Sequence, residues 1–254
     1  TYGDGLFETL RSYSSKIFKF EEHLDRLFQS ARLIFIELPM TRNEIISAVY
    51  KTIEINDLSD SIIRITVTRG EQEPGIIINH DLSPTVVIHA RPIVPISKKT
   101  YKKGVAISLF KNSATKISGI SKQIKSCNYL SHIILKEKAL KEGSFEGIML
   151  DHENNVTEGT TSNIFVIKNN EIRCPELNEF VLSGITRQVI FNIASANKIL
   201  LKETILNESD IYDADEVFLT NTGIEILPVC SVNKYTIGNG KPGPITKYLH
   251  KNFR

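Results

Sequence analysis

A stretch of small and polar residues at positions 112–123 separates two halves that carry clear hydrophobic patterns. The stretch reads Asn-Ser-Ala-Thr-Lys-Ile-Ser-Gly-Ile-Ser-Lys-Gln and has no hydrophobic period, which is typical of a connection between domains. We therefore predict an N-terminal domain over 1–111, a linker over 112–123 and a C-terminal domain over 124–254. A chain of 254 residues can bury a core in each half without disulfides or a structural metal.

Both halves mix helix and strand patterns. In the first half, helical periodicity predicts helices over 22–33 and 41–56, and Thr41 with Glu44 forms the signature of a capping box. Alternation and β-branched runs predict strands over 15–20, 62–68, 85–90 and 105–110, of which 62–68 and 85–90 are expected to be buried.

The second half continues the mixture. The patterns predict helices over 128–141, 185–197 and 244–252, and strands over 147–151, 163–168, 171–174, 216–220 and 225–229. Because strands and helices do not alternate regularly, we predict α+β domains rather than a doubly wound parallel sheet.

Charge and composition exclude several classes of function. The formal net charge is +2 and no long basic run occurs, which argues against a nucleic-acid partner and against a charged membrane surface. No apolar run approaches the ~18 residues that span a bilayer. The histidines and the three cysteines lack metal-ligand spacing, so no metal site is predicted. The cysteines are odd in number and widely scattered, which suits a reducing compartment, so we expect a cytoplasmic protein. The chain opens inside a motif-like run, so we also expect a segment before Thr1.

The run Ile124-Lys-Ser-Cys-Asn-Tyr129 places a lysine between the polar stretch and a predicted helix. A lysine amine can form a Schiff base with an aldehyde cofactor. Taken alone, a solvated lysine before a helix is the more common outcome.

Two further motifs suit an anionic cofactor with a ring nitrogen. Glu158, in Val156-Thr-Glu-Gly-Thr-Thr-Ser-Asn, offers a carboxylate for a protonated ring nitrogen, and a polar turn is the alternative. In Leu182-Ser-Gly-Ile-Thr-Arg187, the amides of Ile185 and Thr186 begin a helix, and such amides favour a phosphate. A plain helix start explains this second motif equally well.

Two more motifs are weaker by themselves. Leu219-Thr-Asn-Thr-Gly223 offers hydroxyls and amides after a strand, although a simple turn is the commoner meaning of this pattern. Arg26 lies on the first predicted helix, shortly after the run Tyr2-Gly-Asp-Gly-Leu-Phe-Glu-Thr-Leu-Arg11, where a surface arginine is the usual outcome.

Together and in this order, these motifs resemble the fold-type IV pyridoxal-phosphate enzymes. That family includes branched-chain aminotransferases, D-amino acid aminotransferases and aminodeoxychorismate lyases. The resemblance extends from Tyr2 almost to the C-terminus. It implies a two-domain α+β subunit with pyridoxal 5'-phosphate in the inter-domain cleft, a cofactor-binding C-terminal domain over 124–254, and a homodimer.

The same resemblance implies roles for individual residues. Lys125, in a Lys-x-x-Asn pattern, matches the Schiff-base lysine and catalytic residue, whereas Lys122 lacks this spacing. Glu158 matches the partner of the pyridine nitrogen, and Arg26 a ligand of the phosphate. The implied cofactor contacts are Arg26, Lys125, Tyr129, Glu158, Leu182, Ile185, Thr186, Asn221 and Thr222. The implied substrate contacts are Phe7, Thr9, Arg64 and Gly223.

The reaction within this family is less sharply indicated. Ile62-Ile-Arg64 keeps the arginine but not the tyrosine of the branched-chain pattern, and no Arg-x-His pair follows Thr68-Arg-Gly70 as in D-amino acid enzymes. Phe7-Glu-Thr9 resembles the lyases, whereas Glu225-Ile-Leu-Pro-Val229 and the 240–246 tail resemble the aminotransferases.

We predict a transaminase that moves an amino group between an amino acid, branched-chain L- or D-, and a 2-oxo acid. The alternative is a 4-amino-4-deoxychorismate lyase that releases pyruvate and 4-aminobenzoate. A binding protein that has lost its chemistry is less favoured, since every matched position is intact.

Overall fold

The computed structural model describes residues 2–71, 75–79, 83–114 and 124–253. It consists of two compact units. The first unit comprises residues 1–94 and 123–128, and the second comprises 95–122 and 129–254. From residue 115 onward, the predicted linker lies outside the described residues.

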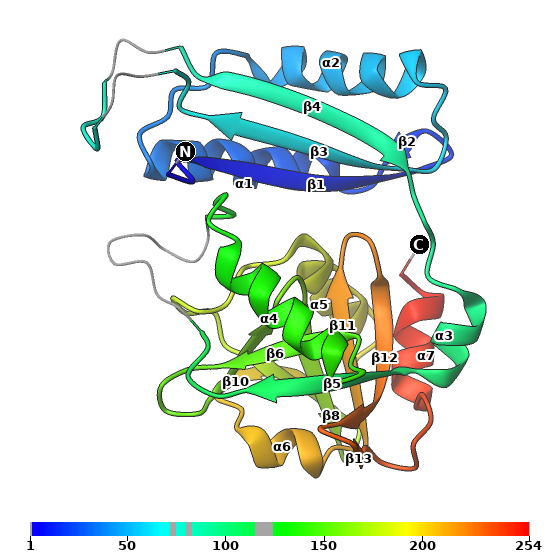
Figure 1. Ribbon diagram of the computed structural model, residues 1–254. Helices are drawn as coiled ribbons and strands as arrows, with labels where there is room; N and C mark the ends of the chain where they lie inside the picture. Colours follow the sequence, from blue (N-terminus) through cyan, green and yellow to red (C-terminus); the bar gives the residue numbers. More distant parts are fainter. Residues whose placement is uncertain (1, 72–74, 80–82, 115–123, 254) are drawn as a thin grey trace. The chain divides into compact units, whose positions relative to one another are not determined.

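The first unit is a four-stranded antiparallel sheet with two helices on one face (Figure 1). Its strands run in the order β2-β1-β3-β4. The elements are β1 (Gly5–Tyr13), β2 (Lys16–Ile17), α1 (Phe20–Leu33), α2 (Arg42–Ile55), β3 (Ser61–Thr68) and β4 (Thr85–Pro92). Leu24 and Leu27 of α1 and Ile45 and Val49 of α2 form one core with the strands, so the helices cover one face of the sheet.

The start of α2 confirms the predicted capping box. The Thr41 side chain accepts a hydrogen bond from the Glu44 amide. In return, the Glu44 carboxylate accepts one from the Thr41 amide, with 2.7 Å between the amide nitrogen and Oε2. These two bonds satisfy amides that no helical turn can pair.

Two strand predictions in this unit need correction. The first strand, β1, was not predicted, because the buried charge of Glu8 interrupts the apolar row of Leu6 and Leu10. The strand β4 was expected to be buried, but it lies at the sheet edge and Val87 is 52% exposed. Residues 15–20 form only the short β2 before α1 begins.

The second unit is a nine-stranded mixed sheet with helices packed against it (Figure 1). Its strand order is β10-β9-β8-β11-β12-β5-β6-β7, with β13 paired to β12. The strands are β5 (Val105–Phe110), β6 (Glu146–Leu150), β7 (Val156–Gly159), β8 (Asn163–Lys168), β9 (Glu171–Pro175), β10 (Leu201–Thr204), β11 (Glu216–Asn221), β12 (Glu225–Val232) and β13 (Tyr235–Thr236). The helices are α3 (Lys98–Lys103), α4 (Leu130–Lys141), α5 (Ile185–Ala196), α6 (Glu208–Tyr212) and α7 (Pro244–Lys251).

The pairing confirms the predicted mixed α+β character. Most neighbouring strands are antiparallel, while β5 pairs in parallel with β6 and β12, and β9 with β10. Helix α4 packs on β5 and β6, whereas α5 and α7 pack on β11. The short elements β7, β10, α3 and α6 were not predicted, since each is too brief to show a hydrophobic period.

The division between the units differs from the predicted boundary at residue 111. Strand β5 was assigned to the first half, yet its hydrogen-bonding partners β6 and β12 both belong to the second unit. Conversely, Lys125 was assigned to the C-terminal domain and lies in the first unit. Among the described residues, no helix is long and apolar enough to cross a membrane.

The capping box gives a stability test. Thr41→Ala removes the side-chain acceptor at the start of α2, so we expect the free energy of unfolding to fall by about 1 kcal/mol. Urea denaturation followed by circular dichroism measures this change. Ser47→Ala, at an exposed position within the same helix, is the control and should not destabilise the protein. Equal stability of Thr41→Ala and the wild type would contradict the capping assignment.

Candidate functional site

In the first unit, the segment that carries Lys125 is bound to β1. The Phe7 amide donates to the Lys125 carbonyl, and the Cys127 amide donates to the Gly5 carbonyl, both at 2.9 Å. Ser126 forms an antiparallel bridge with Leu6. The lysine therefore has a fixed backbone along the part of β1 that β2 does not cover.

The side chains of two predicted site residues, Lys125 and Arg64, lie against the ring of a third, Phe7. The Lys125 Nζ lies 4.7 Å from the centroid of the buried Phe7 ring, and the Arg64 guanidinium carbon lies 3.6 Å from the same centroid. Thr9 pairs with Arg64 across β1 and β3, so these residues share the sheet face away from the helices. Four of the predicted residues, Phe7, Thr9, Arg64 and Lys125, are thus brought together.

Cys127 follows Lys125 closely but is a poor nucleophile. Burial raises the pKa of its thiol, and the positive charge of Arg64 only partly opposes this effect. A thiol with a raised pKa carries little thiolate at neutral pH, so Cys127 is not suited to act as a nucleophile.

Arg26 projects from α1 to Glu8 on the other face of β1. Its Nε lies 2.6 Å from Glu8 Oε1 and one terminal nitrogen lies 2.8 Å from Oε2, while His23 Nδ1 lies 2.7 Å from Oε2. The arginine is therefore not a solvated surface residue. Glu8 and His23 were missed by the sequence analysis, although a glutamate between Leu6 and Leu10 in a strand was a usable signal.

The Glu8 carboxylate is held in its charged form. Complete burial raises its pKa, but the charge of Arg26 and the hydrogen bonds from His23 and Arg26 outweigh burial, so the pKa falls from 4.5 to about 2.

In the second unit, Glu158 is buried and fixes the chain ahead of α5. Its Oε2 accepts the Leu182 amide at 2.8 Å, and the Asn163 side-chain amide donates to the Leu182 carbonyl at 2.9 Å. Both backbone groups of Leu182 are thus satisfied by side chains from β7 and β8. Asn163 was not predicted as a site residue.

The start of α5 is shaped to accept an anion. Gly184 is its N-cap and provides no side chain to bind the first amides, which include those of Ile185 and Thr186. A Cβ atom at Gly184 would lie 2.1 Å from Asn163 Oδ1, so a larger residue here would displace the Asn163 side chain. Free amides at a helix N-terminus are the usual protein site for a phosphate.

The turn between β11 and β12 lies at the same end of the strands as Asn163, because Thr220 of β11 pairs with Asn163 of β8. The Asn221 side chain accepts the amides of Gly223 and Ile224 at 2.8 and 2.9 Å, and donates to Thr161. Its side chain therefore shapes the turn. The hydroxyl oxygen of Thr220 is buried and has no hydrogen-bond partner among the described residues.

The hydroxyl groups that follow Glu158 share one hydrogen-bond acceptor. Those of Thr160, Thr161 and Ser162 all point to the buried carboxylate of Glu146. Tyr129, another predicted contact, stacks on His132 with ring centroids 4.6 Å apart. Neither Glu146 nor His132 was predicted.

The comparisons with known proteins identify the family. The family described as amino-transferase class IV matches residues 5–232. The chain belongs to the class IV aminotransferases. It is 36% identical over its whole length to 87% of a Methanocaldococcus jannaschii protein that carries the name branched-chain-amino-acid aminotransferase. It is also 34% identical, over 97% of its length, to 85% of the D-alanine aminotransferase of Bacillus licheniformis.

Solved structures agree on the fold. The Escherichia coli branched-chain amino acid aminotransferase has a TM-score of 0.94 at 30% identity, covering 99% of this chain and 85% of the other. The Thermoproteus uzoniensis branched-chain aminotransferase with norvaline has a TM-score of 0.91 at 29% identity, with 100% and 85% covered. A Legionella pneumophila protein assigned as 4-amino-4-deoxychorismate lyase reaches 0.87 at 27%, with 99% and 92% covered. The predicted fold-type IV architecture and transaminase activity are confirmed.

The class IV aminotransferases depend on pyridoxal 5'-phosphate, and the residues present fit this group. The chain provides a half-buried lysine at position 125, a buried carboxylate at Glu158 and a helix start at Gly184 without a side-chain cap, where a Cβ would meet the Asn163 side chain. The hydroxyl of Thr220, which pairs with Asn163 at the ends of β11 and β8, is a further buried polar group. By contrast, the described residues contain no group of three or more acidic, histidine or cysteine side chains that could hold a metal ion.

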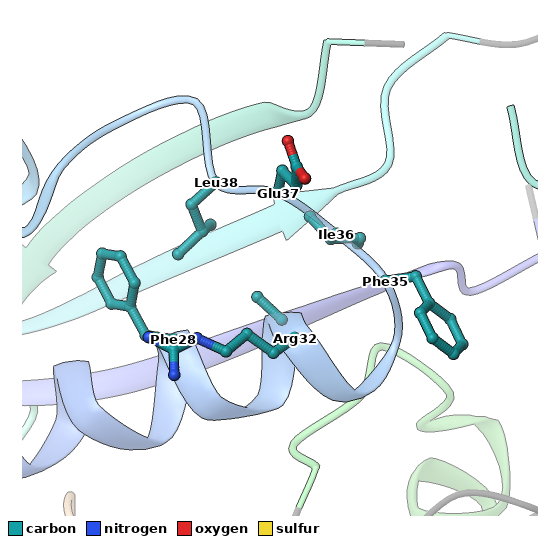
Figure 2. Close-up of a pocket in the computed structure, with 7 residues that line it drawn as sticks. Phe28, Arg32, Phe35, Ile36, Glu37 and Leu38 are labelled. Atoms are coloured by element: carbon teal, nitrogen blue, oxygen red, sulfur yellow. The ribbon is translucent and has the colours of Figure 1, made fainter. Parts of the chain in front are cut away.

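A cavity of about 500 Å³ lies elsewhere in the first unit, at the end of α1 (Figure 2). It is lined by Phe28, Ala31, Arg32, Phe35, Ile36, Glu37 and Leu38. None of these residues is a predicted contact, and the lining offers no lysine for a Schiff base. We therefore do not assign the cavity to this aminotransferase's active site.

The Glu8 ion pair gives a test of pH dependence. Because its folded-state pKa is lowered, Glu8 stabilises the class IV fold above pH 4.5, and this contribution is lost as the pH falls toward 2. Glu8→Gln should therefore lower the free energy of unfolding at pH 7 by about 2–3 kcal/mol and flatten its decline in acid. Urea denaturation at a series of pH values measures both effects, with the exposed Glu54→Gln as control. A Glu8→Gln profile parallel to that of the wild type would contradict this role.

Proposed function

We propose that the protein is a pyridoxal 5'-phosphate-dependent transaminase in which Lys125 binds the cofactor. The observation that carries this proposal is the attachment of the Lys125 segment to β1, which holds an amine beside Phe7 and Arg64. We further propose that Lys125 and the second-unit set around Glu158, Leu182 and α5 act on the same cofactor. In support, only residues 126–128 separate Lys125 from Tyr129 along the chain.

Each side chain then has a defined task. Pyridoxal 5'-phosphate, when bound, supplies an aldehyde for the amino group and a ring that accepts electrons. The Lys125 amine would hold the cofactor at its aldehyde, and the free amine would accept the proton from the substrate α-carbon. The Glu158 carboxylate holds a proton on the ring nitrogen, since an opposite charge favours the protonated form.

Three parts of the chain are proposed to bind the phosphate: the start of α5, Arg26 and Thr222. The amides of Ile185 and Thr186 at the α5 start donate to it, and Arg26 adds a positive charge whose direction Glu8 sets. The hydroxyl of Thr222 is a further donor in the β11–β12 turn, while Leu182 supplies apolar contact with the ring. Because the Gly223 amide is already bound to Asn221, Gly223 contributes shape to the substrate site more than a hydrogen bond.

The amino donor is a branched-chain L-amino acid or a D-amino acid, and the partner is a 2-oxo acid. In support, the relatives include proteins named for both substrate classes at 36% and 34% identity. Arg64, stacked on Phe7, is the proposed ligand of a substrate carboxylate. The family resemblance also predicts a homodimer and the scattered cysteines predict a cytoplasmic protein, and both of these properties stay predictions.

The lyase alternative rests on Thr9. Its place on β1, paired with Arg64, would put a hydroxyl near a carboxylate-bearing substrate. The lyase-assigned neighbour has lower identity than the curated aminotransferase relatives, at 27% against 36%, so transamination is the proposal.

A half-reaction screen tests the reaction and the donor. The cofactor-loaded protein is mixed with one amino acid at a time, L-leucine, L-valine, D-alanine or their mirror images. Conversion of the bound cofactor to its amine form is followed by absorbance, and a 2-oxo acid should restore the original spectrum. We expect conversion by one stereochemical series only. Rapid release of pyruvate from aminodeoxychorismate, with no amino acid active, would establish the lyase instead.

The phosphate site has its own test. Gly184→Ala places a Cβ against the Asn163 side chain, which holds the Leu182 carbonyl ahead of α5, so we expect the dissociation constant for pyridoxal 5'-phosphate to rise about tenfold. Equilibrium dialysis measures it. Ser195→Ala, exposed near the other end of α5, is the matched control. If both variants bind the cofactor as tightly as the wild type, the phosphate does not bind at the α5 start.

A further inference from the structure

The carboxylate of Glu146 lies at the centre of the connection between β7 and β8, residues Thr160–Ser162. Glu146 is fully buried at the first position of β6. Thr160 donates its hydroxyl to Oε1, while Thr161 and Ser162 donate to Oε2 at 2.9 and 3.3 Å. One acidic side chain therefore orders the hydroxyls of three consecutive residues.

The charge of Glu146 is balanced only in part by a cation. The Lys136 Nζ lies 3.3 Å from Oε1 and also donates to the Phe145 carbonyl, and the Gly147 amide donates to Oε1 at 3.0 Å. Burying a carboxylate is costly, and replacing such groups by apolar ones is often neutral or stabilising. Fold stability is thus a weak explanation for a glutamate at this position. The hydrogen bonds that Glu146 accepts do, however, hold its three hydroxyl partners in place.

The same connection holds two of the proposed cofactor contacts through its backbone. The Thr160 carbonyl accepts from His132 Nδ1 at 2.8 Å, and His132 stacks on Tyr129. The Thr161 carbonyl accepts from the Asn221 side chain at 3.0 Å, and Asn221 shapes the β11–β12 turn. A shift of this connection would therefore move Tyr129 and the turn together.

Glu158 is linked to the same connection through the chain. Gly159, the next residue, donates its amide to the Ser162 carbonyl at 2.7 Å, which closes a tight loop. A Cβ at Gly159 would lie 2.3 Å from the Ser162 hydroxyl oxygen, so this loop has no spare volume. The position of the Ser162 hydroxyl on Glu146 therefore bears directly on where the Glu158 carboxylate lies.

We propose that Glu146 is a positioning residue for the cofactor. Its carboxylate fixes the Thr160–Ser162 connection, and that connection sets Glu158, Tyr129 and the Asn221 turn in register with one another. This inference rests on the proposed function, because it takes these three groups to be cofactor contacts. Glu146 itself touches none of the reacting atoms.

The test replaces the charge while keeping the size. Glu146→Gln is loaded with pyridoxal 5'-phosphate, and two quantities are measured besides thermal unfolding of the cofactor-free protein. These are the dissociation constant and the visible circular dichroism per bound cofactor, which reports how the ring is held. We expect the dissociation constant to rise about tenfold and the dichroism to change. A loss of this size is typical of metal sites when a residue that orients a metal ligand is replaced.

Glu216→Gln is the matched control. Glu216 is also a buried carboxylate of the second unit, but it binds the Ile245 and Thr246 amides at the start of α7. This variant should lose stability and keep the dichroism per bound cofactor. Thr161→Val removes one hydroxyl bond to Glu146 and should show a smaller change of the same kind as Glu146→Gln, even if the latter fails to fold.

Two results would overturn the inference. One is unchanged affinity and dichroism in whichever of Glu146→Gln and Thr161→Val folds. The other is an equal rise in the dissociation constant in Glu216→Gln, because the effect would then follow stability alone. A wild-type protein that binds no pyridoxal 5'-phosphate would instead contradict the proposed function, so the two failures can be told apart.

Discussion

Two backbone hydrogen bonds fix the segment that carries Lys125, the lysine proposed to bind the cofactor. They join Phe7 to Lys125 and Cys127 to Gly5, on either side of the isolated antiparallel bridge between Leu6 and Ser126. A lysine on a free loop would sample many positions and would react with an aldehyde without orientation. Backbone pairing removes that freedom and leaves the side chain beside Phe7 and Arg64, which is what a residue that both binds a cofactor and moves a proton requires.

The rest of the candidate site depends on carboxylates that are buried with their partners. Glu8 fixes Arg26 through two contacts, Glu158 fixes the chain before α5, and Glu146 fixes the connection that follows Glu158. In low dielectric surroundings each of these contacts is stronger than in water, and each unpaired group would be expensive. The proposed cofactor contacts are thus oriented by charged hydrogen bonds rather than by apolar packing alone.

The sequence predicted well what local rules decide. The capping box at Thr41 and the periodic helices appear where expected, because their signals lie within a few residues of each other. Long-range pairing was harder to foresee. Strand β5 joins β6 and β12 through contacts distant in the chain, and β1 was hidden by the charge of Glu8 among apolar residues. Family motifs predicted roles for Lys125 and Glu158, which stay predictions, whereas Glu146, His132 and Asn163 carry no motif of their own and emerge only from the hydrogen bonds.

Chemical mapping of the cofactor-bearing lysine tests the central claim most directly. The protein loaded with pyridoxal 5'-phosphate is reduced with borohydride, digested, and analysed by mass spectrometry with fragment ions that separate neighbouring lysines. We predict that the phosphopyridoxyl group is attached to Lys125 at close to one group per chain. A label on Lys122 or any other lysine, or no label in a protein that binds the cofactor, would contradict the account.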